Sequence, residues 1–233
     1  MDKLTVIIDG KEVEAKADQT IMEAAIAAGV YIPHLCYQQE LVPGGHCRVC
    51  TVMVNGRPQS ACTHPVAEGL VIDNDTPELL EERRRIIEML FVEGNHFCPF
   101  CEKQGNCELQ ALAYRFGMIV PTLPYLHRKI DVDGTHPDVF IDRNRCVLCG
   151  RCVRASRDVD GKSVFGFEGR GPHKSIALNT KGSLSGTQLA AADKAASICP
   201  TGSIVVKRVG YAIPYGKRKF DKEPIGSEIE KAK

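Results

Sequence analysis

Cysteine is the residue with the clearest chemical potential in this chain of 233 residues, which contains eleven of them. The count is odd, and seven of the eleven belong to a C-x-x-C pair. That spacing is typical of metal chelation or redox chemistry rather than of a disulfide framework. The cysteines form three sets of four, three and four along the chain, and the sets differ in spacing. Each set therefore predicts a metal centre of its own.

The first set has the spacing C-x10-C-x2-C-x11-C. Its members are Cys36, Cys47, Cys50 and Cys62. Four thiolates are what a 2Fe–2S cluster requires, two for each iron. Gly44 and Gly45 precede the central pair, and a loop that wraps a cluster needs glycine's backbone freedom to aim N–H groups at it. The alternative is a four-cysteine zinc site, but such sites usually combine two C-x2–4-C pairs and this set has one.

The second set has the spacing C-x2-C-x5-C. Its members are Cys98, Cys101 and Cys107. Three thiolates leave a 4Fe–4S cluster one ligand short, and His96, two residues before the first cysteine, is the candidate for the fourth. A neutral imidazole removes one negative charge relative to thiolate, so it is expected to raise the reduction potential, as in Rieske centres. The alternatives are a helix-end role for His96 and a zinc ion held by the same four residues.

The third set has the spacing C-x2-C-x2-C, with a Cys-Pro pair after a long insertion. Its members are Cys146, Cys149, Cys152 and Cys199. A two-cluster bacterial ferredoxin repeats C-x2-C-x2-C-x3-C-P, and the fourth cysteine of each repeat ligates the other cluster. On that template all four ligands of one 4Fe–4S cluster remain. The ligands of the other are replaced by Ser156, Leu189, Ala192 and Ala195, and the three apolar replacements are expected to fill the vacated site.

The strand and helix patterns around the three cysteine sets predict an α+β protein. The N-terminal part reads as strand, strand, helix, cysteine loop and two further strands, the order of a β-grasp domain. The predicted elements are strands 4–8, 12–16, 49–54 and 70–72 and a helix over 21–28. Helices over 77–92 and 108–116 then form a helical middle region, and from Val139 a strand, a cysteine turn, a helix and a matching helix follow.

These elements divide the chain into three domains and a tail. We expect a 2Fe–2S β-grasp domain over 1–76 and a helical 4Fe–4S region, with one His and three Cys ligands, over 77–138. A 4Fe–4S domain like that of bacterial ferredoxins follows over 139–209. The Lys-rich tail, 210–233, lacks core periodicity, so it is expected to lie on a partner or stay mobile.

Composition excludes several classes of function. The formal net charge is +1, which gives no strong attraction to nucleic acid or an anionic membrane, and the basic runs 83–85 and 217–219 read as solvated surface. The chain opens on a strand pattern rather than a signal peptide, and no stretch approaches the roughly 18 apolar residues of a membrane helix. We therefore expect a cytoplasmic protein. It also lacks a P-loop, a G-x-G-x-x-G fingerprint and a G-x-S-x-G elbow, so no catalytic residue is predicted.

The first set, with its β-grasp order, resembles the longer-loop ferredoxin module of respiratory NADH dehydrogenases and NAD-linked hydrogenases. The second set resembles the cluster region of the same subunits with one His and three Cys ligands. In that family the His lies four residues before the first cysteine, where this chain has Gly94. To about residue 209 the chain resembles both the diaphorase small subunit of NAD-reducing nickel–iron hydrogenases and the N-terminal third of the large iron–sulfur subunit of respiratory complex I. Its length favours the first.

The resemblance implies an electron relay through one 2Fe–2S and two 4Fe–4S clusters. The implied partners are a flavin subunit that handles NAD(H), the diaphorase subunit, and a hydrogenase small subunit. The alternative is the same relay in another NAD(P)-linked complex, such as a formate dehydrogenase or a complex I-like NADH dehydrogenase. Iron-only hydrogenases need further cysteines for their catalytic cluster, and none is left over. The remaining alternative is a non-redox module with structural zinc.

Overall fold

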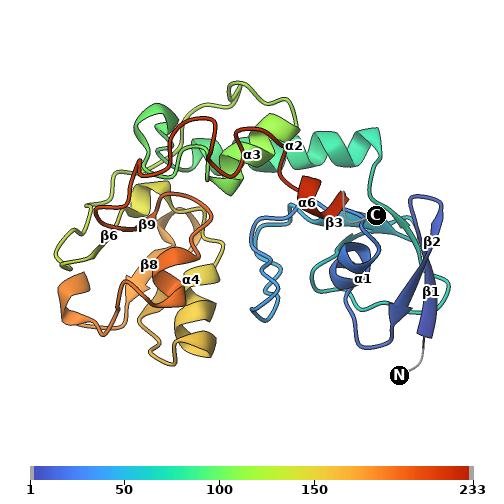
Figure 1. Cartoon of the computed structure of the whole chain (residues 1–233), viewed down its shortest axis with the longest axis horizontal. Helices are drawn as coiled ribbons and strands as arrows, with labels where there is room; N and C mark the ends of the chain where they lie inside the picture. The colour runs from blue at the N-terminus through green and yellow to red at the C-terminus, as the bar shows by residue number, and fades with distance from the viewer. Residues whose placement is uncertain (1–2, 231–233) are drawn as a thin grey trace.

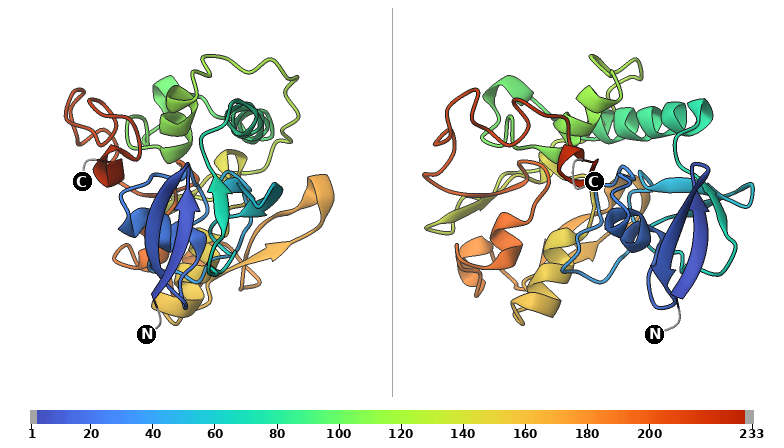
Figure 2. Two further views of the ribbon diagram at one scale, coloured as in Figure 1. Left: turned by 90° about the vertical axis from the view of Figure 1, so that its right-hand side faces the viewer. Right: turned by 45° about the vertical axis from the view of Figure 1, so that its right-hand side comes forward.

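The computed structural model describes residues 3–230 and contains three groups of elements. Figure 1 shows a sheet with one helix at one end, a pair of helices along the top, and a group of short strands and helices at the other end. The second view in Figure 2 confirms that the helix pair lies across both end groups.

The N-terminal sheet has five strands in the order β2-β1-β5-β3-β4. Its strands are β1 (Lys3–Ile8), β2 (Lys11–Lys16), β3 (Thr51–Val54), β4 (Arg57–Ser60) and β5 (Val71–Asp73). The β1–β5 pair is parallel and the other pairs are antiparallel. Both residues of each hairpin turn, Asp9-Gly10 and Asn55-Gly56, have positive φ. Such turns match the twist of the strands that they join.

Helix α1 (Ile21–Ala27) covers one face of this sheet. A capping box begins the helix: the Glu23 N–H donates to Thr20 Oγ1 at 3.3 Å, and the Thr20 N–H donates to the Glu23 carboxylate at 2.7 Å. Its apolar face packs with Val6, Ile8 and Ile72 of the sheet in one buried core. The predicted order of strands and helix in this part of the chain is confirmed.

The middle region is built on α2 (Pro77–Val92) and α3 (Glu108–Arg115), joined through a short 3-10 turn, η1 (Cys98–Phe100). Thr76 caps α2 by accepting a hydrogen bond from the Leu79 N–H, and the helix spans the predicted residues 77–92. The prediction that residues 83–85 form a solvated basic surface is wrong for Arg83, which is 1% exposed. Its guanidinium donates to the Thr51 carbonyl and to the backbone and side-chain oxygens of Asn74. This arginine therefore fastens α2 to the N-terminal sheet.

The C-terminal group pairs two strands from opposite ends of the region. Strand β6 (Val139–Ile141) is antiparallel to β9 (Ile204–Val206), and α4 (Arg151–Arg154) and α5 (Lys194–Ser197) lie between them in sequence. A π-helical turn, Ala155–Val159, continues α4. A second hairpin, β7 (Phe165–Glu168) with β8 (Ser175–Leu178), occupies the long insertion before Cys199. Further 3-10 turns are η2 (Arg143–Arg145), η4 (Gly171–His173) and η5 (Leu184–Gly186).

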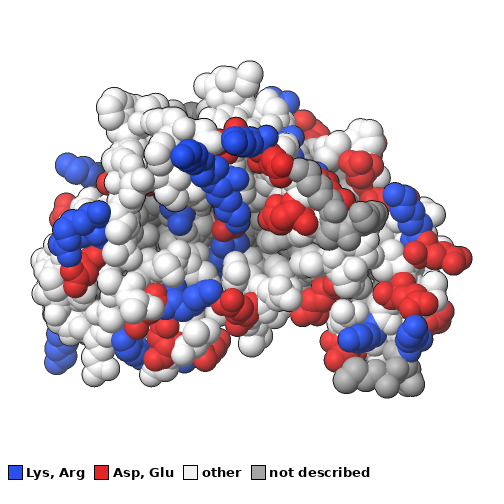
Figure 3. All heavy atoms as spheres, viewed as in Figure 1, with Lys and Arg blue, Asp and Glu red and all other residues white. Residues whose placement is uncertain are grey.

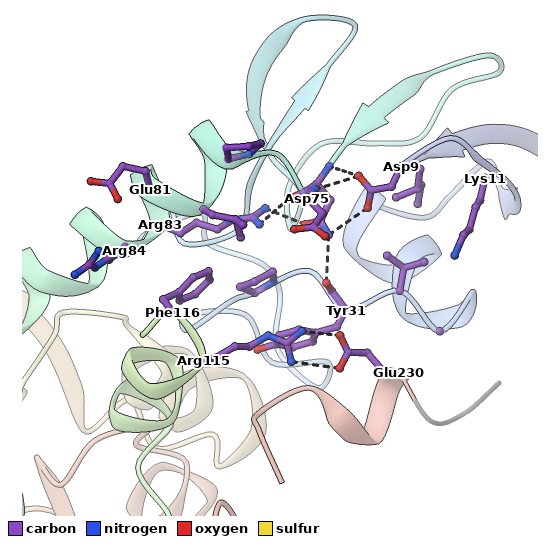
Figure 4. Close-up of a pocket in the computed structure, with 17 residues that line it drawn as sticks. Asp9, Lys11, Tyr31, Asp75, Glu81, Arg83, Arg84, Arg115, Phe116 and Glu230 are labelled. Carbon is purple, nitrogen blue, oxygen red and sulfur yellow. Dashed lines mark hydrogen bonds and ion pairs between the residues drawn. The ribbon is translucent and has the colours of Figure 1, made fainter. Parts of the chain in front are cut away.

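The predicted tail packs on the chain itself through residue 230. The Phe220 N–H donates to the Gly105 carbonyl at 3.0 Å, and Ile225 is buried in the core of the middle region. In the short helix α6 (Ser227–Glu230), Glu230 forms a 2.6 Å ion pair with Arg115 of α3. Figure 4 shows this pair beside Tyr31, which comes from the N-terminal part of the chain. The tail therefore contacts the middle region of its own chain, which its composition did not predict, and 231–233 lie outside the described residues.

The surface carries no large area of one charge on the face that Figure 3 displays. Acidic and basic side chains are interspersed there, and the face is hollowed between the two end groups. This agrees with the formal net charge of +1. Among residues 3–230, no helix has the length and apolar character that a bilayer span requires.

Candidate metal centres

The four cysteines of the first set meet at one end of the N-terminal sheet. Cys36 lies in the loop after α1, Cys47 and Cys50 lie just before β3, and Cys62 follows β4. All four are buried, and the Cys36 N–H donates to Cys47 Sγ at 3.3 Å. Hydrogen bonds with Cys47 and then Cys62 lower the pKa of Cys36, whereas hydrogen bonds with Cys36 and then Cys50 raise the pKa of Cys62. The opposite shifts mean that one thiol ionises at the expense of another. Bound iron ions would stabilise all four as thiolates.

The glycine pair before Cys47 has two different roles. Gly45 has a φ of +62°, the left-handed conformation that the sequence predicted for this loop. Gly44 has no positive φ, so its backbone conformation does not by itself require glycine. A Cβ there would displace the imidazole of His46, which packs closely against this glycine. The loop aims the backbone N–H groups of Cys47 and His46 at Cys36 Sγ, and both lower the pKa of that thiol.

The second set lines a small hollow between η1, α3 and the turn after Cys199. The hollow is bordered by all three of its cysteines and by His96. Burial raises the pKa of Cys107 to about 12 and also raises that of Cys98. Gly202 closes the other side, where a Cβ would lie 2.6 Å from Cys101 Sγ. The structure thus brings together every residue that the sequence predicted for this site.

His96 presents an unpaired nitrogen within this region. Its Nε2 is buried and has no hydrogen-bond partner among the described residues. Burial lowers the pKa of the imidazole to about 4, and the Leu90 carbonyl opposes that shift. The ring is therefore neutral at pH 7, as a metal ligand must be. A Cβ at Gly94 would lie 2.5 Å from this Nε2, so the ring occupies the space that a side chain at position 94 would enter.

The third set lines a second small hollow beside α4 and β9. All four of its cysteines border it, together with Thr201 and Ser203. Burial raises the pKa of Cys146 to about 11 and that of Cys149 to about 12. The Leu148 N–H donates to Cys146 Sγ at 3.4 Å. These four cysteines come together although Cys199 is far from the others in sequence.

Four positions hold other residues where a two-cluster ferredoxin has cysteine ligands, and three of these four residues are buried. Leu189 and Ala195 are buried in the same core as Cys152, as predicted. Ser156 is also buried, and its hydroxyl accepts a 2.7 Å hydrogen bond from the Val164 N–H. Ala192 is exposed, so the prediction that it fills the vacated site is wrong. Two of the three apolar replacements therefore close this space.

Charged residues around the three sets were not predicted from the sequence. Arg145 and Arg151 each directly precede a third-set cysteine, and Arg154 follows two residues after Cys152. Their positions in sequence, next to the candidate ligands, could have identified them as residues of the site. Arg145 bridges toward the second set by donating to Glu102 and to Cys101 Sγ. Within the described part of the chain, no group of three or more His, Cys, Asp or Glu side chains already forms a site for a single metal ion.

Known protein families match this chain in three segments, and each segment contains cysteines of one set. Family models match in three places: "2Fe-2S iron-sulfur cluster binding domain" at 1–77, "NADH-ubiquinone oxidoreductase-G iron-sulfur binding region" at 83–120 and "4Fe-4S single cluster domain" at 139–206. The gamma subunit of the NAD-reducing hydrogenase HoxS from Cupriavidus necator is 39% identical over 225 residues, which cover 95% of each chain.

Two further relatives define the range of the similarity. The G subunit of the NADH-quinone oxidoreductase from Rickettsia prowazekii is 32% identical over 86% of this chain, but the match spans only 30% of that relative. A chain in the crystal structure of an NAD+-reducing [NiFe]-hydrogenase in the H2-reduced state superposes with a TM-score of 0.93 and 45% identity. That superposition covers 96% of this chain and 95% of the other.

Proposed function

This chain belongs to the family of the NAD-reducing hydrogenase gamma subunit, and on that premise we propose that it relays electrons through one 2Fe–2S and two 4Fe–4S clusters. It is an electron-transfer subunit of an oxidoreductase complex, and its relatives support a relay in an NAD-linked hydrogenase. The observation that carries the proposal is that all eleven cysteines gather at three places, with none left over.

We assign the ligands set by set. The 2Fe–2S ligands are Cys36, Cys47, Cys50 and Cys62. The ligands of the first 4Fe–4S cluster are His96, Cys98, Cys101 and Cys107. The ligands of the second 4Fe–4S cluster are Cys146, Cys149, Cys152 and Cys199. Buried thiols around a hollow with backbone N–H donors fit an anionic iron–sulfur cluster, because those donors stabilise the charge on its sulfurs.

His96 departs from the family's spacing, and its geometry supports the assignment. The family's histidine position is Gly94 here, and the imidazole of residue 96 extends back to that position. His96 borders the same hollow as the three cysteines, and its Nε2 is buried without a hydrogen-bond partner among the described residues. The backbone of Leu90 also interacts with the imidazole, and backbone carbonyls commonly orient imidazole ligands in metal sites. We therefore assign His96 as the fourth ligand.

The same assignment divides the chain into functional parts. We propose a β-grasp 2Fe–2S domain over 1–76, a helical region with the His-ligated cluster over 77–138, and a ferredoxin-like domain over 139–209. Residues 210–230 of the tail, 210–233, are proposed as a strap over the middle region. The contacts between Phe220 and Gly105 and the burial of Ile225 support that role.

When bound, the clusters supply one-electron redox chemistry. The protein's residues hold the centres at fixed separations, exclude water from them and set their potentials through hydrogen bonds and ligand type. Buried side chains from α2 and α3 form one core with cysteines of the first and third sets, so the sites are rigidly connected. No residue of this chain is assigned to substrate activation.

We propose two partner subunits and a location. A flavin-containing diaphorase subunit would exchange electrons with NAD(H), and a hydrogenase small subunit would exchange them with the hydrogen-converting centre. Neither nucleic acid nor a membrane is proposed as a partner. A cytoplasmic location fits the chemistry, because ligand cysteines must stay reduced until iron and sulfide are inserted.

A second candidate is the same relay in another NAD(P)-linked complex, such as a formate dehydrogenase or a complex I-like NADH dehydrogenase. The similarity to the G subunit of NADH-quinone oxidoreductase favours it, but this chain spans 30% of that relative. The hydrogenase gamma subunit is matched over 95% of both chains. We therefore place the hydrogenase relay first.

The test is the iron and acid-labile sulfide content of the full chain purified anaerobically, with low-temperature EPR after dithionite reduction. About ten irons and ten sulfides per chain, the sum of two, four and four, support the proposal. About three zinc ions without sulfide would refute it. About six irons would instead refute one 4Fe–4S assignment.

A further inference from the structure

Arg154 lies between the first and third cysteine sets, at the end of α4. Its Nη2–H donates to the backbone carbonyl of Cys36 at 2.6 Å and to that of Cys149 at 3.4 Å. Its Nη1–H donates at 2.7 Å to the carbonyl of Val42, in the loop that leads to Cys47. One guanidinium therefore connects the backbone of a first-set cysteine to the backbone of a third-set cysteine.

Arg151, one turn earlier on α4, makes a related connection. Its Nη2–H donates at 2.9 Å to the carbonyl of Tyr37, the residue after Cys36. It also forms a two-pronged pair, at 2.8 and 2.7 Å, with the carboxylate of Glu108, the residue after Cys107. The two arginines thus contact chain segments that adjoin cysteines of all three sets.

The charge of these two arginines is balanced differently. Both are buried, at 2% and 6% exposure for Arg151 and Arg154. Glu108 neutralises Arg151, whereas Arg154 has no ion pair within residues 3–230, and its four hydrogen bonds all go to carbonyls. Burial of a charge without a counter-charge is energetically unfavourable. Negative charge on the flanking first and third sets would offset that cost.

We propose that Arg154 is a positioning residue of the relay, which fixes the separation between the first and third cysteine sets and places a positive charge between them. The inference rests on the proposed assignment of those sets as cluster ligands. Electron transfer falls steeply with distance, and the two loops cannot move apart without breaking the hydrogen bonds of one guanidinium. Its planar fork reaches several carbonyls at once, which a lysine ammonium cannot reproduce in the same geometry.

The test compares the full chain, purified anaerobically, with its R154M and R154K variants. Iron and sulfide content is measured first, followed by low-temperature EPR of the reduced protein and by redox titration. We expect R154M to keep its iron but to lose magnetic interaction between the first- and third-set centres, with both midpoint potentials shifted downward. We expect R154K to retain potentials closer to those of the unaltered chain while the magnetic interaction stays weakened.

The matched control is R157M, because Arg157 follows on the same helical stretch. Its side chain is 59% exposed, and its guanidinium donates to the neighbouring Asp158 carboxylate. It should behave as the unaltered chain does. Unchanged magnetic interaction and potentials in R154M would overturn the proposal, and if R154M does not accumulate, R154K decides by the same magnetic criterion. An unaltered chain without about ten irons would refute the ligand assignment instead.

Discussion

The guanidinium of Arg145 lies 3.7 Å from the sulfur of Cys101, measured from Nη1 to Sγ. Arg145 directly precedes the first cysteine of the third set, and Cys101 belongs to the second. The same Nη1 is 2.6 Å from the Glu102 carboxylate, and Nε is 2.9 Å from Asp142. A charged donor from one predicted metal centre thus contacts a predicted ligand of another.

The variant Arg145→Gln is expected to lower the midpoint potential of the second-set cluster. Reduction adds negative charge to the cluster, and the Arg145 guanidinium stabilises that charge. Without the guanidinium, the carboxylates of Glu102 and Asp142 lose their cationic partner. A hydrogen bond to a charged group contributes about 1.5–3 kcal/mol, so we expect a downward shift of about 65–130 mV for a one-electron couple. Redox titration followed by EPR measures it. The control is Arg85→Gln, whose exposed side chain pairs with Glu81. An equal shift in both variants, or an upward shift in the first, would contradict the prediction.

Local signals in the sequence predicted much of the fold and all three cysteine groupings. The Asp9-Gly10 and Asn55-Gly56 turns and the caps at Thr20 and Thr76 depend on a few neighbouring residues, so their structures follow from short motifs. The cysteine spacings carried similar information because clusters require particular numbers of thiolates.

Contacts between distant segments could not be predicted in this way. Arg83 sits in a basic run typical of solvated surface, but its partners at Thr51 and Asn74 come from other elements. The tail has no core periodicity, yet its Tyr211 hydroxyl donates to the carbonyl of Phe100, 111 positions earlier. The contacts of these segments depend on the assembled fold rather than on their own composition.

The His96 assignment predicts different outcomes for two substitutions. His96→Ala removes the proposed fourth ligand, so we expect about four fewer irons per chain. His96→Cys supplies a thiolate and is expected to keep the cluster at a lower potential, because the added negative charge disfavours reduction. Iron analysis and redox titration measure the two effects. His127, in the irregular segment before β6, is the matched control for alanine substitution. Full iron content in His96→Ala would exclude this histidine as an essential ligand.

The tail strap predicts that Ile225→Ala destabilises the middle region. Ile225 is 6% exposed and packs in the same core as Ile87, Leu109 and Leu112. Truncating a buried isoleucine to alanine costs about 2–5 kcal/mol, which should lower the midpoint of thermal unfolding. Ile213→Ala in the same tail is the control, since Ile213 is 48% exposed and should cost less than about 0.5 kcal/mol. Equal midpoints for both variants would show that residues near 225 do not stabilise the fold.

Removal of the metal centres is expected to unfold the cysteine-bearing regions, 30–60, 95–110 and 145–200, before the rest of the chain. The thiols of the second and third sets line small hollows, those of the first set are buried, and ligand binding energy contributes to folding in such sites. The core formed by Val6, Ile8 and Ile72 with α1 includes no second- or third-set cysteine, so β1 and α1 should remain the best protected elements. Hydrogen exchange on iron-free and iron-loaded chain measures this difference. Equal protection of the three cysteine regions in both forms would mean that the polypeptide organises its ligand loops without the clusters.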